Sequence, residues 1–132
     1  MKEKIEKLKL LKILFVEDEE SLRNIIKVTF TKLDVTFDTA ENGQEAFEKI
    51  QQNHYDLIVT DINMPILNGL DLIDKIRNIL DLHIPVYIMS AHTEQRYLDR
   101  AKELEVENYI MKPFDFINFI NMTYETQFEV AS

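Results

Sequence analysis

The chain has no cysteine and only two glycines among its 132 residues. The absence of cysteine excludes a disulfide, a thiolate metal site and a cysteine nucleophile. No glycine-rich loop of the kind that cradles a nucleotide or flavin phosphate occurs. No apolar run approaches the roughly 18 residues that a membrane span needs, and charges interrupt the apolar residues of positions 1–12, unlike in a secretory signal. We therefore expect a cytoplasmic protein that does not enter a membrane.

The chain has fewer basic than acidic residues. It contains 15 Lys and Arg and 24 Asp and Glu, which gives a formal net charge of −9. An acidic domain repels a phosphate backbone, so we expect no direct binding of nucleic acid. Positions 114–132 contain neither Lys nor Arg. Apolar residues make up 45% of the chain, which is enough for the core of one globular domain. We assign a charged lead-in to 1–11, the domain to 12–128 and a tail to 129–132.

The chain alternates strand-like and helix-like segments five times. Short runs rich in apolar and β-branched residues predict strands at positions 12–16, 35–39, 57–59, 86–89 and 108–111. Apolar residues at helical spacing predict a helix after each strand, around positions 22–30, 42–50, 72–80, 93–104 and 115–124. Short connections of this kind require parallel strands, with right-handed crossovers that place helices on both faces. We expect an α/β fold with one doubly wound sheet in the flavodoxin-like order 2-1-3-4-5 and five helices.

Polar residues mark where several helices should begin. Asn42 followed by Glu45 has the spacing of a capping box, and Thr93 and Asp115 are suited to cap the fourth and the last helix. The Asn68-Gly69 pair marks the loop after the third strand, since both residues tolerate positive φ. These signals predict short connections between each strand end and the following helix.

Polar side chains also collect where the predicted strands end. In a parallel sheet the carboxyl ends of the strands share one edge, which is where ligands bind. Four neighbouring strands would bring five side chains to this edge, namely Glu17, Asp18, Asp61, Ser90 and Lys112. The second strand ends in Ala40-Glu41-Asn42 and adds nothing obvious. The convergence of these residue types predicts a functional site centred on Asp61.

Three carboxylates in one place need a cation. Two carboxylates 4 Å apart repel by roughly 4 kcal/mol at an effective dielectric near 20. Mg²⁺ prefers oxygen ligands and is commonly bound by one or two carboxylates together with a phosphate oxygen. With the repulsion relieved, Asp61 can attack a phosphoryl group as a nucleophile and form an aspartyl phosphate. Lys112 would supply positive charge to the phosphoryl oxygens, and Ser90 would supply a hydroxyl donor.

Five motifs follow one another along the chain: Leu14-Phe15-Val16-Glu17-Asp18-Glu19, Asp56-Leu57-Ile58-Val59-Thr60-Asp61-Ile62-Asn63-Met64-Pro65, Asn68-Gly69, Ser90-Ala91 and Lys112-Pro113-Phe114. Together, and in this order, they resemble the receiver domains of bacterial two-component response regulators, the chemotaxis receivers among them. The resemblance extends from Lys12 to about Phe128. It implies that Asp61 accepts a phosphoryl group from a histidine kinase or a phosphotransfer protein, with Mg²⁺ as the cofactor.

The same resemblance assigns metal and switch positions. It implies that Asp18 binds Mg²⁺ directly, Glu17 through water and Asn63 through its backbone carbonyl. It implies that Ser90 and Tyr109 form the switch that responds to phosphorylation. Such a domain is not an enzyme beyond weak self-phosphorylation and autodephosphorylation. It acts on a downstream protein target or output domain, as a monomer or a weak dimer.

The chain departs from the family pattern at two places. Glu17 replaces the commoner Asp, and Glu105-Val106 replaces the Gly-Ala pair often found before the fifth strand. In DNA-binding members that dimerise through the fourth helix, fifth strand and fifth helix, the last helix supplies basic residues, and here it has none. The last helix is more apolar than one inward-facing stripe requires, through Ile117, Phe119, Met122 and Phe128. This excess fits either generous core packing or a hydrophobic docking face.

Other functions for the same fold fit these residues less well. A phosphatase of the haloacid dehalogenase type needs a second Asp two residues after the nucleophile, where this chain has Asn63. A flavin protein would need a phosphate-binding loop after the first strand, and the acidic run at 17–20 would repel that phosphate. The alternative that stays open is a receiver-like interaction module that works without phosphorylation. A stand-alone receiver and a part of a longer regulator or hybrid kinase both fit the sequence.

We also expect a cis peptide bond between Lys112 and Pro113. Bonds that precede proline are the ones that adopt cis at low cost. A cis bond in a tight loop would turn the Lys112 side chain back over the site, and the family resemblance points the same way.

Overall fold

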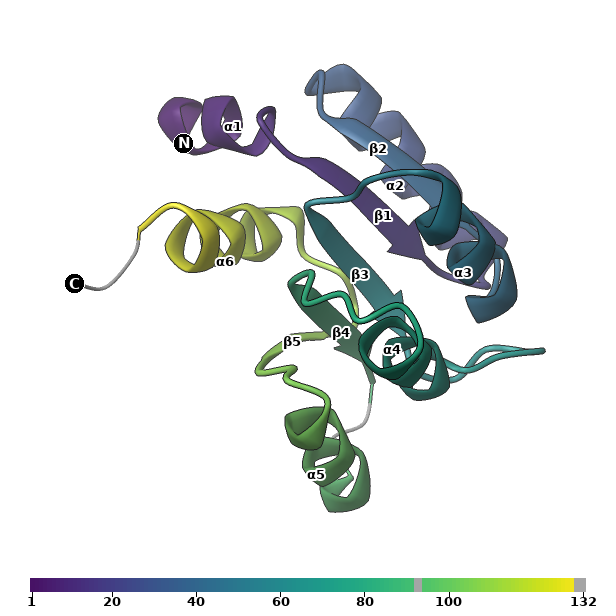
Figure 1. Ribbon diagram of the computed structural model, residues 1–132. Helices are drawn as coiled ribbons and strands as arrows, with labels where there is room; N and C mark the ends of the chain where they lie inside the picture. The colour runs from purple at the N-terminus through teal and green to yellow at the C-terminus, as the bar shows by residue number, and fades with distance from the viewer. Residues whose placement is uncertain (92–93, 130–132) are drawn as a thin grey trace.

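The computed structural model describes residues 1–91 and 94–129, which form a five-stranded parallel sheet flanked by helices (Figure 1). The strands are β1 (Lys12–Val16), β2 (Thr36–Ala40), β3 (Leu57–Asp61), β4 (Val86–Ser90) and β5 (Asn108–Met111). The helices are α1 (Lys2–Leu8), α2 (Glu20–Lys32), α3 (Gly43–Gln52), α4 (Gly69–Asn78), α5 (Gln95–Glu103) and α6 (Phe116–Gln127). The strand order is β2-β1-β3-β4-β5, so the predicted topology is confirmed.

Side chains of the sheet alternate between two hydrophobic clusters. Leu14 and Val16 of β1 belong to the cluster that α3, α4 and α5 cover, whereas Ile13 and Phe15 belong to the cluster that α2 and α6 cover. This period of two explains why the central strands β1, β3 and β4 are apolar along most of their length, since both of their faces are buried, whereas the edge strands β2 and β5 are partly exposed and more polar. The carboxyl-terminal edge of the sheet is therefore left to carry the polar residues.

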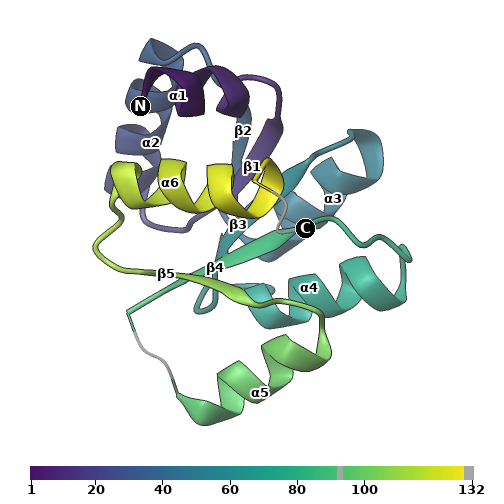
Figure 2. The ribbon, with the colours of Figure 1, turned by 90° about the vertical axis from the view of Figure 1, so that its left-hand side faces the viewer.

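A sixth helix departs from the predicted five. Helix α1 occupies most of the charged lead-in and lies beside α6 (Figures 1 and 2). Leu8 is 1% exposed and joins the cluster under α2 and α6. Lys4 Nζ donates a hydrogen bond of 2.9 Å to Asn121 Oδ1, and Lys7 Nζ lies 5.9 Å from the centroid of the Phe128 ring. The lead-in thus packs on the domain through a short apolar stripe. None of the helices that the structure describes has the length and apolar character to cross a bilayer.

Two of the predicted helix caps are present. Asn42 Oδ1 accepts a hydrogen bond of 2.8 Å from Glu45 N at the start of α3. Asp115 Oδ1 accepts hydrogen bonds of 2.9 and 3.1 Å from two backbone amides at the start of α6. Thr93, predicted to cap the helix before β5, lies outside the described residues, and that helix begins at Gln95. These caps satisfy amides that have no partner within the helix.

Candidate functional site

Three strands deliver the charged residues at the centre of the site. Asp61 ends β3, Glu17 follows β1 and Lys112 follows β5. The Lys112 Nζ atom donates hydrogen bonds of 2.7 Å to Asp61 Oδ2 and 2.8 Å to Glu17 Oε1. The peptide bond between Lys112 and Pro113 is cis, as predicted. The structure thus brings together the three side chains that the strand order placed at one edge.

Asp18 adds a third carboxylate to the same place. One oxygen from each of Glu17, Asp18 and Asp61 lies within 4.8 Å of the other two. Glu17 and Asp61 are buried, whereas Asp18 is exposed, so the cluster opens to solvent on the Asp18 side. The donor set consists of carboxylate oxygens, which is the chemistry that Mg²⁺ prefers. Asn63, the remaining predicted ligand, is exposed two residues after Asp61, and the role of its backbone carbonyl stays a prediction.

Burial and hydrogen bonding shift the pKa values of two members of the cluster, Glu17 and Lys112. Burial raises the pKa of Glu17 from 4.5 to about 7, although the hydrogen bond with Lys112 opposes this shift. Burial also lowers the pKa of Lys112, but the hydrogen bonds to Asp61 and Glu17 outweigh it, and the pKa of Lys112 is raised. Lys112 is therefore cationic at neutral pH, whereas Glu17 is partly protonated near pH 7 in the metal-free protein.

Replacing Glu17 with glutamine should stabilise the metal-free protein at pH 8. Because its pKa is raised in the folded state, Glu17 contributes stability below about pH 4.5 that is lost as the pH rises through about 7. Glutamine keeps the shape without the charge, so we expect a gain on the order of 2 kcal/mol at pH 8 and little difference at low pH. Urea denaturation in chelator at both pH values measures this, with the exposed Glu20→Gln as the control. An equal gain at both pH values would contradict the expectation.

The predicted switch residues Ser90 and Tyr109 lie on neighbouring strands. Ser90 ends β4 and is buried, and its backbone carbonyl accepts a hydrogen bond of 3.0 Å from Lys112 N. Tyr109 is half-buried in β5, pairs in register with Ile88 and packs against the cluster under α3, α4 and α5. Burial raises the pKa of the Tyr109 hydroxyl. Ser90 is thus linked to the site through Lys112, and the switching role of both residues stays a prediction.

Gly69 is required by a close approach of two backbone segments. It begins α4, and a Cβ atom at this position would lie 1.9 Å from the carbonyl oxygen of Asp61. Asn68 caps the helix through its side chain. The loop lies where the sequence predicted it, but neither Asn68 nor Gly69 has positive φ; in this loop that conformation occurs at Ile66, with φ 72°. The glycine therefore lets α4 pack directly against the strand end that carries Asp61.

Arg23 supports the acidic loop, although no sequence motif pointed to it. Its side chain is buried, and Nη1 donates hydrogen bonds of 3.0 Å to the backbone carbonyls of both Glu17 and Asp18. Nη2 lies 3.4 Å from Glu41 Oε1. The end of β2, where the sequence showed nothing obvious, therefore contributes through Glu41. A signal was present in the sequence, because Arg23 falls on the stripe of α2 that is otherwise apolar and buried.

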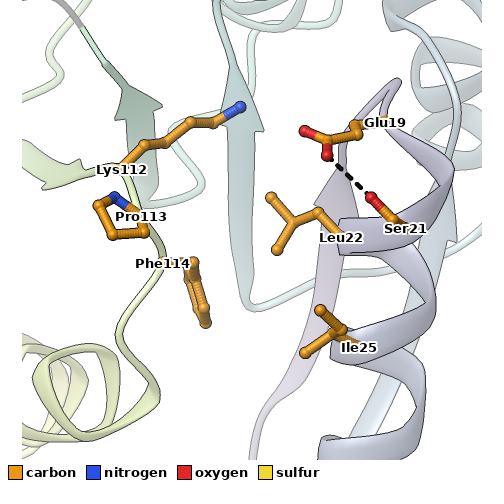
Figure 3. A pocket seen from close by; sticks show the side chains of 7 residues that line it. All are labelled: Glu19, Ser21, Leu22, Ile25, Lys112, Pro113 and Phe114. Atoms are coloured by element: carbon orange, nitrogen blue, oxygen red, sulfur yellow. Dashed lines mark hydrogen bonds between the residues drawn. The ribbon is translucent and has the colours of Figure 1, made fainter.

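An apolar groove of about 400 Å³ adjoins the site on the α2 side. In Figure 3 the segment after β5 frames one side and α2 the other, the lining residues being Glu19, Ser21, Leu22, Ile25, Lys112, Pro113 and Phe114. Ile25 and Val28 are more than half exposed, so the outer face of α2 presents branched apolar side chains to solvent. Because Lys112 lines the groove and also contacts Asp61, a molecule in the groove would lie beside the carboxylate cluster.

Comparison with known proteins finds a family model that covers most of the chain. The response regulator receiver domain model matches residues 13–124. The response regulator ArlR of Staphylococcus aureus (strain Mu50 / ATCC 700699) is 33% identical over 103 residues, which cover 78% of this chain and 46% of ArlR. The chain therefore spans about half the length of the curated relatives that it matches.

Solved structures share the fold. The chemotaxis protein CheY4 of Vibrio cholerae has a TM-score of 0.79 at 24% identity, over 86% of this chain and 96% of CheY4. One chain has a TM-score of 0.79 at 21% identity, over 87% of each chain, and comes from a Saccharomyces cerevisiae co-crystal structure. That crystal contains the histidine phosphotransfer protein Ypd1 and the receiver domain of its downstream response regulator Ssk1. At these identities the likeness concerns the fold alone.

Proposed function

This chain belongs to the response regulator receiver domain family, and from that premise we propose that it accepts a phosphoryl group on Asp61 in an Mg²⁺-dependent step of two-component signalling. The observation that supports this most directly is the contact of Lys112 Nζ with Asp61 Oδ2 at 2.7 Å. The contact lies at the end of a central strand, beside the carboxylates of Glu17 and Asp18. A carboxylate so placed is a nucleophile with a cation already at hand for the incoming phosphoryl oxygens.

The proposed transfer is a displacement at phosphorus. A carboxylate oxygen of Asp61 attacks, the P–N bond to the donor's histidine breaks, and the electron pair leaves with the imidazole nitrogen. Lys112 places positive charge where the phosphoryl oxygens gain negative charge, and the hydroxyl of Ser90 is a donor from the neighbouring strand. Mg²⁺ held by Glu17, Asp18 and Asp61 would neutralise the carboxylates and draw the phosphoryl group toward them.

Two slower reactions belong to the same proposal. A small phosphodonor can replace the phosphohistidine, because the attack needs only Asp61, its cations and a suitable leaving group. Water can later attack phosphorus, whereupon the P–O bond to Asp61 breaks and orthophosphate leaves. The chain is therefore a phosphoacceptor with weak self-phosphorylation and autodephosphorylation, not an enzyme with a separate substrate.

We infer that the phosphodonor is a histidine kinase or a phosphotransfer protein that docks over α2. The groove opens beside Lys112, and the exposed Ile25 and Val28 offer apolar surface to a partner helix. The co-crystal structure of Ypd1 with the Ssk1 receiver domain supports this class of partner. The phosphorylated domain would act on a downstream protein or output domain in the cytoplasm, as a monomer or weak dimer, and its net charge of −9 disfavours direct nucleic acid binding.

Incubation with acetyl phosphate and Mg²⁺ should add one phosphoryl group per chain, on Asp61. The reason is the carboxylate cluster around Asp61 and its contact with Lys112. Intact-mass measurement should show the gain for the wild type and for Asp99→Asn, which changes an exposed aspartate of α5. It should show none for Asp61→Asn or in excess chelator. Incorporation that persists in Asp61→Asn would place the phosphoryl group on another residue and refute this assignment. No incorporation in the wild type would favour the phosphorylation-independent interaction module.

Replacing Ser90 with alanine should leave Asp61 able to accept a phosphoryl group but should uncouple Tyr109 from it. A phosphoryl group adds charge and acceptor oxygens, which draw the nearby hydroxyl of Ser90 and so rearrange the strand ends next to β5. NMR spectra with and without a phosphoryl mimic should show a reduced response at Tyr109 in Ser90→Ala. Ser90→Thr, which keeps the hydroxyl, should retain it. A full response at Tyr109 in Ser90→Ala would refute this route.

A further inference from the structure

We propose that Arg23 is a positioning residue for the metal site, which holds the backbone of Glu17 and Asp18 so that their carboxylates meet beside Asp61. The inference rests on the proposed Mg²⁺ site and adds a residue to it. Arg23 touches no carboxylate of the cluster in the contacts described, and it acts through the backbone of two residues that do.

The contacts of Arg23 are unusual for a charged side chain. Arg23 is only 8% exposed. The carboxylate with which it forms an ion pair, at 3.4 Å, belongs to Glu41, whose side chain is 65% exposed. The shorter hydrogen bonds, both 3.0 Å, go from a single nitrogen to two consecutive backbone carbonyls, those of Glu17 and Asp18. Burying a guanidinium costs free energy unless its N–H donors are satisfied. Here the two backbone carbonyls and Glu41 accept from it, so these contacts offset the cost and fix the position of the Arg23 side chain.

The backbone conformation at Glu17 and Asp18 is constrained, because their two consecutive carbonyls both accept hydrogen bonds from one nitrogen of Arg23. In a strand, successive carbonyls point to opposite sides, and both can approach one donor only where the chain turns away from strand geometry. That turn lies at Glu17 and Asp18, directly after β1. This turn sets the direction of the Asp18 side chain. One carboxylate oxygen of Asp18 lies within 4.8 Å of a carboxylate oxygen of Glu17 and of Asp61. Arg23 therefore holds the turn that brings the exposed ligand to the two buried ones.

The contact with Glu41 also connects Arg23 to the end of the neighbouring strand, β2. Glu41 follows β2, and Glu17 N donates a hydrogen bond of 3.0 Å to Ala40 O at the same strand end. Within the guanidinium, Nη1 donates to the two backbone carbonyls, whereas Nη2 contacts the Glu41 carboxylate. A lysine has one ammonium on a flexible stem and lacks the planar fork of the guanidinium, so it cannot reproduce the arrangement.

Arg77 provides a matched control for the experiment. It is also 8% exposed, and its guanidinium donates hydrogen bonds of 2.9 Å to the backbone carbonyls of Leu104 and Leu82. These carbonyls lie near the ends of α5 and α4, on segments that carry none of the proposed ligands. Arg23→Lys and Arg77→Lys should therefore lose similar stability, while only one of them disturbs the metal site.

The test measures Mg²⁺ affinity and phosphorylation separately. We expect Arg23→Lys to weaken Mg²⁺ binding about 10-fold in calorimetric or NMR titrations, as second-sphere changes do, and Arg77→Lys to leave the Kd unchanged. At saturating Mg²⁺ the rate of phosphorylation by acetyl phosphate should return close to the wild-type value in Arg23→Lys. An unchanged Kd in a folded Arg23→Lys variant, or an equal change in both variants, would overturn the proposal. Loss of phosphorylation in a wild type that binds Mg²⁺ would instead overturn the proposed function.

A milder variant covers the case in which Arg23→Lys does not fold. Glu41→Gln removes only the exposed side of the contact and should weaken Mg²⁺ binding about two-fold, whereas Glu48→Gln, an exposed glutamate of α3, should not. The backbone amide of Glu19, which donates a hydrogen bond of 3.2 Å to Glu17 Oε2, should shift in metal-free NMR spectra of Glu41→Gln. If both glutamate variants match the wild type in Kd and in this resonance, the proposal is wrong.

Discussion

Replacing Lys112 with methionine should slow phosphorylation of Asp61 about 100-fold, because the positive charge beside the reacting oxygens is lost. The same change should destabilise the metal-free protein at pH 8. Lys112 Nζ contacts Asp61 at 2.7 Å and Glu17 at 2.8 Å, so its removal leaves two buried carboxylates without their shared cation. Removing one side of a buried ion pair costs about 3 kcal/mol.

The pH dependence of this loss identifies its cause. Without Lys112 the pKa of Glu17 should rise above its already raised value of about 7, so Glu17 is neutral at pH 5.5 and needs no partner. The loss of stability should therefore be smaller at pH 5.5 than at pH 8. Urea denaturation in chelator and the initial rate of mass gain with acetyl phosphate measure the two effects. Lys102→Met, an exposed lysine of α5, should change neither. An equal loss of stability at both pH values would assign it to the aliphatic stem of Lys112 instead.

Replacing Gly69 with alanine should destabilise the protein by about 3 kcal/mol, although alanine is the better helix former. The added Cβ would lie 1.9 Å from the Asp61 carbonyl oxygen and 3.1 Å from the Cα atom of Ile62. These are backbone atoms, so neither can move aside without displacing the end of β3. Phosphorylation should fall as well, since the displaced residue is Asp61 itself.

A matched position tests the sign of this effect. Gln95 begins α5 as Gly69 begins α4, and it is exposed. By helix propensity alone, alanine should stabilise both helices, and Gln95→Ala should do so slightly or have no effect. Thermal denaturation of the two variants compares propensity with steric conflict directly. A stable Gly69→Ala variant would show that the α4 start can retreat from β3.

The sheet and the main site follow from the sequence because both depend on order along the chain. Strands buried on both faces are apolar throughout, and short connections force them to run parallel, so their carboxyl ends share one edge. Once the order β2-β1-β3-β4-β5 was inferred, the positions of Asp61, Glu17 and Lys112 at the same edge of the sheet followed. The same pattern did not predict that α1 packs on the domain, because its apolar stripe is short and its buried residue Leu8 is flanked by lysines.

By itself the sequence determined the alternation of strands and helices, the strand order and the residue types at the carboxyl edge, since each of these depends on local pattern and chain order. Only the tertiary structure decided how Arg23 meets Glu17, Asp18 and Glu41, why position 69 is glycine, and that burial raises the pKa of Glu17 to about 7. These features depend on distances and burial between segments that are separate in sequence. Hydrogen bonds, steric contacts and desolvation act through space, so they become visible only when the packed neighbours of each group are known.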